Sequence, residues 1–316
     1  MYKKIALCAY VLLIFHTSLT FNSPFQEAPL LTEDFIAEFV ILTASYNNEK
    51  YCEENLASIA FQKSSKPYHI IIINDCSTDK TGELLERFIH THQLESKVTL
   101  IHNTKRCYSL ENIYTAIHNH IEDHKIVVSV DGDDLLSSDH VLLRLEQEYK
   151  TPHIHLTYGS QLHFTDRLPS SNGTKVITRA SKIPDNIIRN GKIRTLRKFI
   201  AGHLKTFRAG LFKQIKKEDL MYEGKFLQIT GDVAFMYPMI DMLASPRKDE
   251  PLHVSFIPDI LYLWNNKNPI NDYKKDSTLQ QRMRNHILTL KPYSPIDTTL
   301  LKHSPQIKHN DFTLTH

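Results

Sequence analysis

The stretch Ile126-Val127-Val128-Ser129-Val130-Asp131-Gly132-Asp133-Asp134 decides the fold class, because in it a buried strand runs directly into an acidic turn. An Ile- and Val-rich run without polar alternation is typical of a strand covered on both faces. Similar runs predict strands at Phe39–Thr43, Tyr68–Ile73, Val98–Ile101 and Ile154–Thr157. Helical periodicity predicts helices between them, at Glu49–Gln62, Thr78–His92, Ser109–His120 and Asp139–Tyr149. This alternation predicts an α/β fold with a mostly parallel central sheet.

The composition indicates a folded protein with no strong charge bias. The chain has 316 residues, which suits one large or two modest domains, and 41% of them are hydrophobic, enough for a core. Its 38 basic and 35 acidic residues leave a net charge of +3, which argues against a dedicated nucleic-acid binder. The four cysteines have neither C-x-x-C nor zinc-finger spacing, so no disulfide framework is expected.

The N-terminus carries a targeting pattern. Lys3 and Lys4 precede the apolar run Ile5–Phe15, which favours a signal peptide or signal anchor over residues 1–21. A buried helix or a mobile tail is the alternative. We therefore expect a membrane-associated protein or one of the secretory pathway. A linker is expected at residues 22–37, a main domain at 38–271, and a helical or loose C-terminal tail at 272–316.

The acidic turn is the strongest candidate for a functional site. Asp131 and Asp133 point the same way in extended chain and could share one ion, and hard oxygen ligands suit Mg²⁺ or Mn²⁺. The alternative is a solvated turn whose Asp caps a helix. A Walker phosphate loop, a G-x-G-x-x-G and a G-x-S-x-G are all absent, which argues against P-loop enzymes, dinucleotide oxidoreductases and α/β-hydrolases.

Four stretches in this order resemble the family 2 glycosyltransferases, an inverting class that uses nucleotide sugars. They are Val40–Asn47, Ile71–Asp79, Asp131–Asp134 and Gly231–Ala234. The resemblance covers roughly residues 38–271 and implies the GT-A fold, a Rossmann-like three-layer α/β/α sandwich. It also implies an inverting transfer of sugar from a nucleotide-diphosphate sugar to an acceptor hydroxyl.

The resemblance assigns roles to single residues. It places Ala44, Tyr46 and Asp75 at the nucleotide base, with Arg106 as a looser donor contact. It gives Asp131 to the ribose and diphosphate, gives the metal to Asp133 with Asp131 and Asp134 assisting, and makes Asp232 the catalytic base. The sequence departs from the family at Asn74 and Cys76, and at Gly231, where many members have a glutamate.

Two further residues, His203 and Trp264, are candidates for the acceptor side. His203 precedes Leu204–Arg208, a stretch expected near the acceptor, and Trp264 offers an aromatic face on which a sugar ring stacks. Core packing is the alternative for Trp264, and a helix cap is the alternative for Asp232. The pairs His118/His120 and His153/His155 lack completing ligands and are predicted to be surface residues.

Three function classes compete at this point. The leading hypothesis is a metal-assisted glycosyltransferase with a nucleotide-sugar donor and a glycan, lipid or protein acceptor. A sugar nucleotidyltransferase shares the α/β layout, but Thr43–Lys50 lacks the expected glycines. A non-catalytic GT-A-like binding module would have lost the acidic set that this chain keeps. The segment Gln281-Arg282-Met283-Arg284-Asn285 lacks the Trp of Q-x-x-R-W, which argues against a processive synthase.

Overall fold

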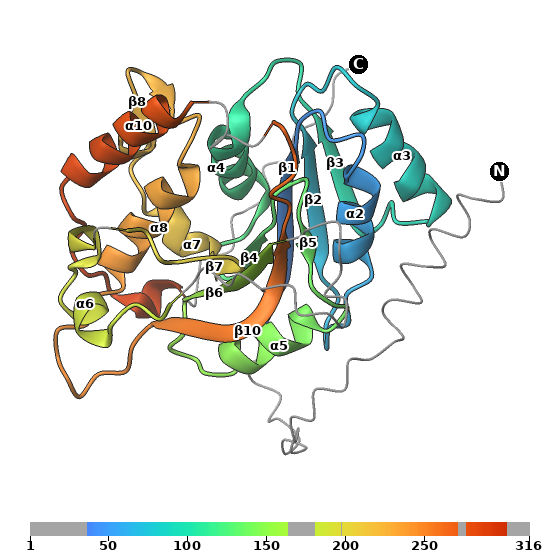
Figure 1. Ribbon diagram of the computed structural model, residues 1–316. Helices are drawn as coiled ribbons and strands as arrows, with labels where there is room; N and C mark the ends of the chain where they lie inside the picture. The colour runs from blue at the N-terminus through green and yellow to red at the C-terminus, as the bar shows by residue number, and fades with distance from the viewer. Residues whose placement is uncertain (1–36, 164–180, 197, 271–275, 302–316) are drawn as a thin grey trace, which may run out of the picture.

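A computed structural model describes residues 37–163, 181–196, 198–270 and 276–301. Its centre is an eight-stranded sheet with the strand order β3-β2-β1-β4-β7-β6-β10-β5 (Figure 1). The strands of this sheet are β1 Phe39–Ser45, β2 His69–Asn74, β3 Val98–His102, β4 Ile126–Ser129, β5 Leu135–Leu136, β6 Leu156–His163, β7 Lys205–Arg208 and β10 Val254–Trp264.

Helices surround the sheet, and a small hairpin lies apart from it. The α-helices are α2 Cys52–Ala60, α3 Thr81–Thr91, α4 Tyr108–His120, α5 Val141–Tyr149, α6 Asp185–Arg189, α7 Ala209–Lys213, α8 Gly231–Met242 and α10 Ser277–Thr289. Short 3₁₀ turns are η1 Ile193–Thr195, η2 Lys217–Leu220 and η3 Thr298–Leu301, and the hairpin pairs β8 Met221–Tyr222 with β9 Lys225–Phe226.

The first half of the sheet is parallel, as the alternation predicts. β1 pairs in parallel with β2 and with β4, and β2 pairs in parallel with β3. Successive residues of β1 point to opposite faces: Val40 and Leu42 join one hydrophobic cluster, whereas Phe39 and Ile41 join the other. Helices α2, α3 and α5 cover the second cluster, and α4, α7 and α8 cover the first. The three-layer α/β/α arrangement is therefore confirmed.

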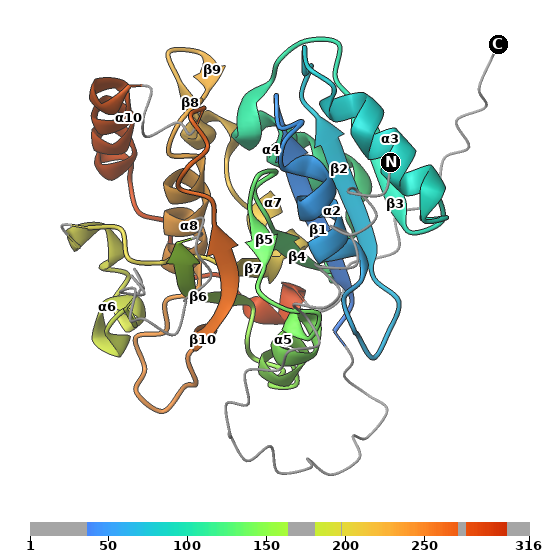
Figure 2. The same ribbon diagram turned by 45° about the vertical axis from the view of Figure 1, so that its right-hand side comes forward.

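The second half of the sheet is mixed. β7 lies between β4 and β6 and is antiparallel to both, and β5 is antiparallel to β10. The pair β6 and β10 is parallel, with irregular register between Ile257 and Tyr262. Helices α8 and α10 lie at this end of the molecule, far from α2 and α3 (Figures 1 and 2).

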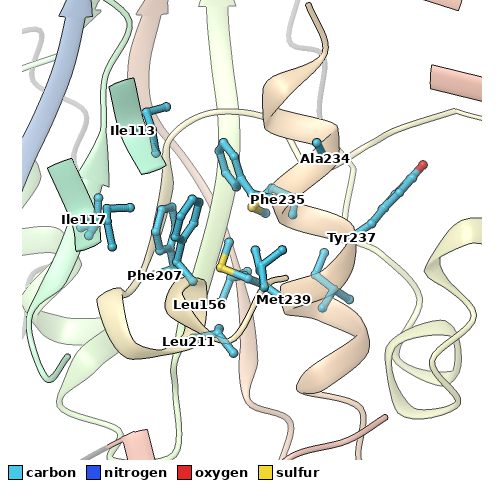
Figure 3. Close-up of a cluster of buried hydrophobic side chains, with 14 of the residues drawn as sticks. Ile113, Ile117, Leu156, Phe207, Leu211, Ala234, Phe235, Tyr237 and Met239 are labelled. Carbon is cyan, nitrogen blue, oxygen red and sulfur yellow. The ribbon is translucent and has the colours of Figure 1, made fainter. Parts of the chain in front are cut away.

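Helix α8 is buried on nearly every side, which fixes the position of its first turn. Every residue from Val233 to Met242 is buried. Phe235 packs against Phe207 of β7 and Phe212 of α7, with ring centroids 5.6 and 5.8 Å apart (Figure 3). A helix that is apolar all round belongs in a core, so residues next to its N-terminus are held by packing behind them.

One sequence prediction of burial needs correction against the structure. His155 is fully buried and accepts a hydrogen bond from Arg208 Nε at 3.1 Å, so it is not a surface residue. The helix α10 lies within the helical or loose tail expected at 272–316, and its residues Met283 and Ile287 pack into the same hydrophobic cluster as α8. In the described part of the chain, no helix is both long and apolar enough to cross a membrane. The predicted signal or anchor at residues 1–21 lies outside the described residues.

Candidate active site

One cavity of about 510 Å³ gathers most of the predicted site residues. It opens beyond the carboxyl ends of β1, β2 and β4, where ligands bind in parallel α/β sheets. It lies between the segments that follow β1 and β2, where the resemblance predicts the nucleotide, and the elements β7, α8 and the end of β10, where it predicts the acceptor. These two walls are named the nucleotide side and the acceptor side after that expectation. The predicted residues that line the cavity are Ala44, Tyr46, Asp75, Arg106, Asp131, Asp133, His203, Asp232 and Trp264.

Asp75 is buried at the nucleotide side and is held by the start of α4. Its Oδ1 accepts hydrogen bonds from Asn103 Nδ2 and from the backbone N–H of Cys107, both at 2.8 Å. Its Oδ2 accepts one from the backbone N–H of Tyr108, also at 2.8 Å. The carboxylate therefore receives N–H groups near a helix N-terminus, where a negative charge is favoured.

An aromatic stack lies next to Asp75. The guanidinium of Arg106 is 3.6 Å from the centroid of the Tyr46 ring and 4.4 Å from that of Tyr108. Stacked guanidinium and ring planes attract each other electrostatically. Tyr108 was not among the predicted site residues, although it directly follows Arg106 and Cys107 in the loop that holds Asp75.

The acidic turn after β4 brings two carboxylates to the cavity. Gly132 is required there, because a Cβ would come within 2.6 Å of the Ala44 carbonyl oxygen. Asp133 accepts a hydrogen bond from Asn268 Nδ2 at 2.7 Å. Asp131, whose side chain is 47% exposed, lies 4.0 Å from His203 Nε2.

Asp134 does not line the cavity, which corrects its assignment as an assisting metal ligand. It is 1% exposed, and its carboxylate accepts from the Tyr262 hydroxyl and the Asn265 backbone N–H, both at 2.6 Å. Burial, with the nearby charges of Asp133 and Asp131, raises the pKa of Asp134 well above its usual range. The role that this geometry supports is to hold the turn, because its partners anchor the acidic segment to β10.

Asp232 lies in the first turn of α8 and faces the cavity. The helix begins at Gly231 and Thr230 occupies its N-cap position without a side-chain cap bond, so Asp232 is not the N-cap residue, although its carboxylate binds an N–H of the first turn. Its Oδ1 accepts from the backbone N–H of Val233 at 2.8 Å. Its Oδ2 lies 3.3 Å from Lys205 Nζ, and the side chain remains 40% exposed.

His203 is fixed between aromatic and cationic neighbours. Its ring stacks on Tyr262 with a centroid distance of 4.4 Å and an interplanar angle of 17°. Its Nε2 lies 3.0 Å from Lys205 Nζ. Burial and the charge of Lys205 lower the pKa of His203 well below its usual range, so the imidazole is neutral at neutral pH.

Several lining residues were missed by sequence reasoning. Lys205 stands in a stretch that was expected near the acceptor but was given no role. Gln281 and Arg284 were weighed only as part of a processive motif, although α10 brings them to the cavity. Residues three apart on a helix share one face, so the spacing of Gln281 and Arg284 could have indicated that they point the same way. The lining residues for which the sequence indicated no role include Tyr108, Lys205, Asn268, Gln280, Gln281 and Arg284.

The sequence matches the family described as Glycosyl transferase family 2 over residues 40–216, more than half of the chain. The chain belongs to this family and is therefore a transferase enzyme of the glycosyltransferase class. Family membership removes the sugar nucleotidyltransferase from consideration.

Particular relatives match less of the chain. It is 36% identical over 52 residues to poly(ribitol-phosphate) beta-N-acetylglucosaminyltransferase TarS of Staphylococcus aureus, which is 16% of this chain and 9% of TarS. The crystal structure of S. aureus TarS 1-349 aligns with a TM-score of 0.51 and 20% identity, covering 72% of this chain and 60% of that one. The same TarS fragment in complex with UDP aligns with a TM-score of 0.50, 20% identity and the same coverage. These likenesses show the GT-A fold.

Proposed function

We propose that this cavity transfers a sugar, with inversion, from a nucleoside-diphosphate sugar to an acceptor hydroxyl. The observation that carries the proposal is that Asp75, Asp131, Asp133 and Asp232 line one cavity, although up to 157 positions separate them in the sequence (232 − 75). Its volume of about 510 Å³ lies within the usual range for small-molecule sites.

The hydrogen bonds of Asp75 favour a base with a single imide N–H. A carboxylate offers about four acceptor positions. Two donors occupy Oδ1 and one occupies Oδ2, which leaves one position on Oδ2. Uracil and thymine present one ring N–H, whereas guanine presents adjacent N1–H and N2–H donors and cytosine presents an acceptor at N3. We therefore propose a uridine- or thymidine-diphosphate sugar, in keeping with the complex of TarS with UDP.

Tyr46 and Arg106 supply the stacking surface for that base. The guanidinium of Arg106 lies over the Tyr46 ring, and both residues line the same cavity as Asp75. A base whose N–H points at Asp75 would lie against this pair, because aromatic and guanidinium planes both favour stacking on a flat π-system. The backbone around Ala44 closes the same side of the cavity.

Asp131 and Asp133 fit a divalent ion held jointly with the donor diphosphate. Among the described residues no group of three or more His, Cys, Asp or Glu side chains could hold a metal by itself. Two carboxylates in one cavity still suit Mg²⁺ or Mn²⁺, because Mg²⁺ commonly takes one or two carboxylates and completes its shell with phosphates and water. When bound, such an ion offsets the negative charge that builds on the leaving diphosphate.

Asp232 is the proposed general base. The acceptor hydroxyl oxygen forms a bond to the anomeric carbon while the bond from that carbon to the diphosphate oxygen breaks, and Asp232 takes the hydroxyl proton. Its 40% exposure allows an acceptor to reach it. Trp264, held edge-on by His163 at 4.5 Å between centroids, supplies an aromatic wall for the acceptor sugar.

The N-terminal segment belongs to the proposal as well. We propose that residues 1–21 target or tether the enzyme to a membrane, and that the acceptor is a glycan, lipid or protein. A test is to fuse this segment to a reporter protein and to fractionate the cells. Recovery of the fusion in the soluble fraction without processing contradicts the tether.

A donor panel tests the function. The full-length protein is incubated with UDP-, dTDP-, GDP- and CDP-sugars, with Mn²⁺ or with EDTA, and the released nucleoside diphosphate is measured. We expect release from at least one uridine- or thymidine-based donor, and only with the metal. No release from any donor, or equal release in EDTA, contradicts the proposal.

A further inference from the structure

A buried ammonium group lies under the acceptor side of the cavity. The Lys205 side chain is only 2% exposed, although lysine is rarely buried unless its charge is paired. It stands at the start of β7, opposite Ser129 at the end of β4. Asp131, the first residue of the acidic turn, comes two residues after Ser129 in the chain. The pairing of β4 with β7 therefore places Lys205 close to this turn.

Lys205 has two side-chain partners, and both face the cavity. Its Nζ lies 3.3 Å from Asp232 Oδ2 and 3.0 Å from His203 Nε2. Because an ammonium group can only donate, His203 Nε2 accepts a hydrogen bond from Lys205 Nζ. One cation thus fixes the orientation of both an imidazole and a carboxylate.

The difference in exposure separates the roles of Lys205 and Asp232. Asp232 is 40% exposed and can meet an acceptor, whereas Lys205 at 2% offers almost no surface to a ligand. A lysine that bound the donor diphosphate directly would need its ammonium accessible from the cavity. Here the partners of the ammonium are the side chains of His203 and Asp232.

We propose that Lys205 is a positioning residue that acts through Asp232. Its ammonium holds the Oδ2 side of the carboxylate, while the Val233 N–H holds Oδ1. Together they set the direction in which Asp232 meets the acceptor hydroxyl. This inference rests on the proposed function and adds to it a residue that does not touch the substrate.

The test is a kinetic comparison of Lys205→Met with wild-type protein, because Met keeps the length of the side chain and removes the charge. The probes are UDP for binding, and cleavage of the first nucleotide sugar that wild-type protein accepts in the donor panel. Misplacing a catalytic group by about 1 Å can cost on the order of 10²-fold. We expect kcat to fall about 10- to 100-fold, with the donor KM and the UDP dissociation constant within about twofold of wild type.

Lys213→Met is the matched control. Lys213 also forms a partly buried ion pair, 2.7 Å from Asp123, but it does not line the cavity. Its loss should leave kcat within about twofold. If Lys205→Met fails to fold, as judged by circular dichroism, Lys205→Gln keeps a donor for His203 Nε2 and carries the same expectation.

A double variant separates positioning from other roles. If Lys205 acts through Asp232, adding Lys205→Met to Asp232→Asn should lower kcat by no more than about twofold beyond Asp232→Asn alone. Multiplied losses, a donor KM raised tenfold or more, or an unchanged kcat in Lys205→Met would overturn the inference and leave the glycosyltransferase proposal standing. A wild-type protein that cleaves no nucleotide sugar overturns both.

Discussion

The nucleotide and acceptor sides of the cavity are held in place by different interactions. On the nucleotide side, Asp75 is the only charged side chain buried among the described residues 37–129, and backbone N–H groups with one amide hold it. The elements that form the acceptor side, β7 and α8, bury Lys205 at the cavity and Arg208 and Asp241 away from it. Their partners come from distant segments, such as Asp232 for Lys205 and Arg194 for Asp241.

This difference predicts how sensitive each side of the cavity is to substitutions. Backbone donors near a helix N-terminus change little when side chains are substituted, so we expect the nucleotide side to tolerate changes elsewhere. Side-chain charges that pair across long loops depend on every partner. Substitutions on the acceptor side should therefore alter catalysis while nucleotide binding persists, and substitutions on the nucleotide side should do the reverse.

The largest effect is expected at Asp232. Asp232→Asn keeps an acceptor oxygen for Lys205 or Val233 but removes the base, so cleavage should fall by about 10²–10⁴-fold. UDP affinity, measured by calorimetry, should stay within about twofold. Asp185→Asn is the control, because Asp185 also begins a helix and pairs with Lys182 at 2.8 Å outside the cavity. A near-wild-type rate for Asp232→Asn would move the base elsewhere.

Metal removal is expected to have the next largest effect. An ion that stabilises the diphosphate contributes several kcal/mol, so EDTA should lower turnover by on the order of 10²–10³-fold. Asp133→Ala and Asp131→Asn should each raise the Mn²⁺ concentration needed for half-maximal rate. Asp139→Asn, an acidic residue outside the cavity that pairs with Lys63, should not. Full activity in EDTA would contradict the metal role of the turn.

The acceptor side should also respond to pH through Asp241. Burial raises the pKa of Asp241 to about 6, although Arg194 opposes that shift. Because the folded pKa lies above the unfolded value, this group stabilises the fold below about pH 4, and the stabilisation is lost as pH rises through 6. A shift of about two units corresponds to about 3 kcal/mol.

Urea unfolding of wild type and Asp241→Asn at pH 4 and pH 7 measures this contribution. The difference in unfolding free energy, wild type minus variant, should fall by about 2 kcal/mol from pH 4 to pH 7, because the unfolded carboxyl is already partly ionised at pH 4. The Asp185→Asn control should show no such trend, because Asp185 is exposed. An equal difference at both pH values would remove Asp241 from the account.

The smallest expected effect is the difference in affinity between nucleotides that carry different bases. Asp75 has one acceptor position for the base, so UDP and dTDP should bind about 10- to 100-fold more tightly than CDP or GDP, the range for leaving one buried polar group unsatisfied. Asp75→Asn should reduce that preference, while Asp232→Asn should preserve it. Equal affinities for all four nucleotides in wild type would show that Asp75 does not read the base.

The parallel half could be predicted from the sequence because its signals are local. Uninterrupted runs such as Ile70–Ile73 are buried on both faces, and β1, β2 and β4 end at polar segments that line the cavity. The site residues there follow directly from strand ends. Asp134 was misassigned because its neighbours on β10, including Tyr262, are more than a hundred residues away.

The mixed half could not be predicted in the same way. β7 is only Lys-Thr-Phe-Arg, and its two cations are buried by partners that no local pattern reveals. In β10, Pro258 and Asp259 interrupt the apolar run, so its hydrophobic pattern does not continue along the strand. The role of Lys205 depends on the pairing of β7 with β4 and on the position of Asp232, in the first turn of α8, next to Lys205. Those are contacts of tertiary structure.

The configuration of the sugar at its anomeric carbon reports directly on the displacement that Asp232 is proposed to assist. A single displacement with Asp232 as base must invert that carbon, because the acceptor attacks opposite the leaving diphosphate. Proton NMR of the product first formed from an α-linked nucleotide sugar, recorded before mutarotation, should therefore show the β configuration. A first-formed product with the α configuration would contradict the single displacement and the role of Asp232 in it.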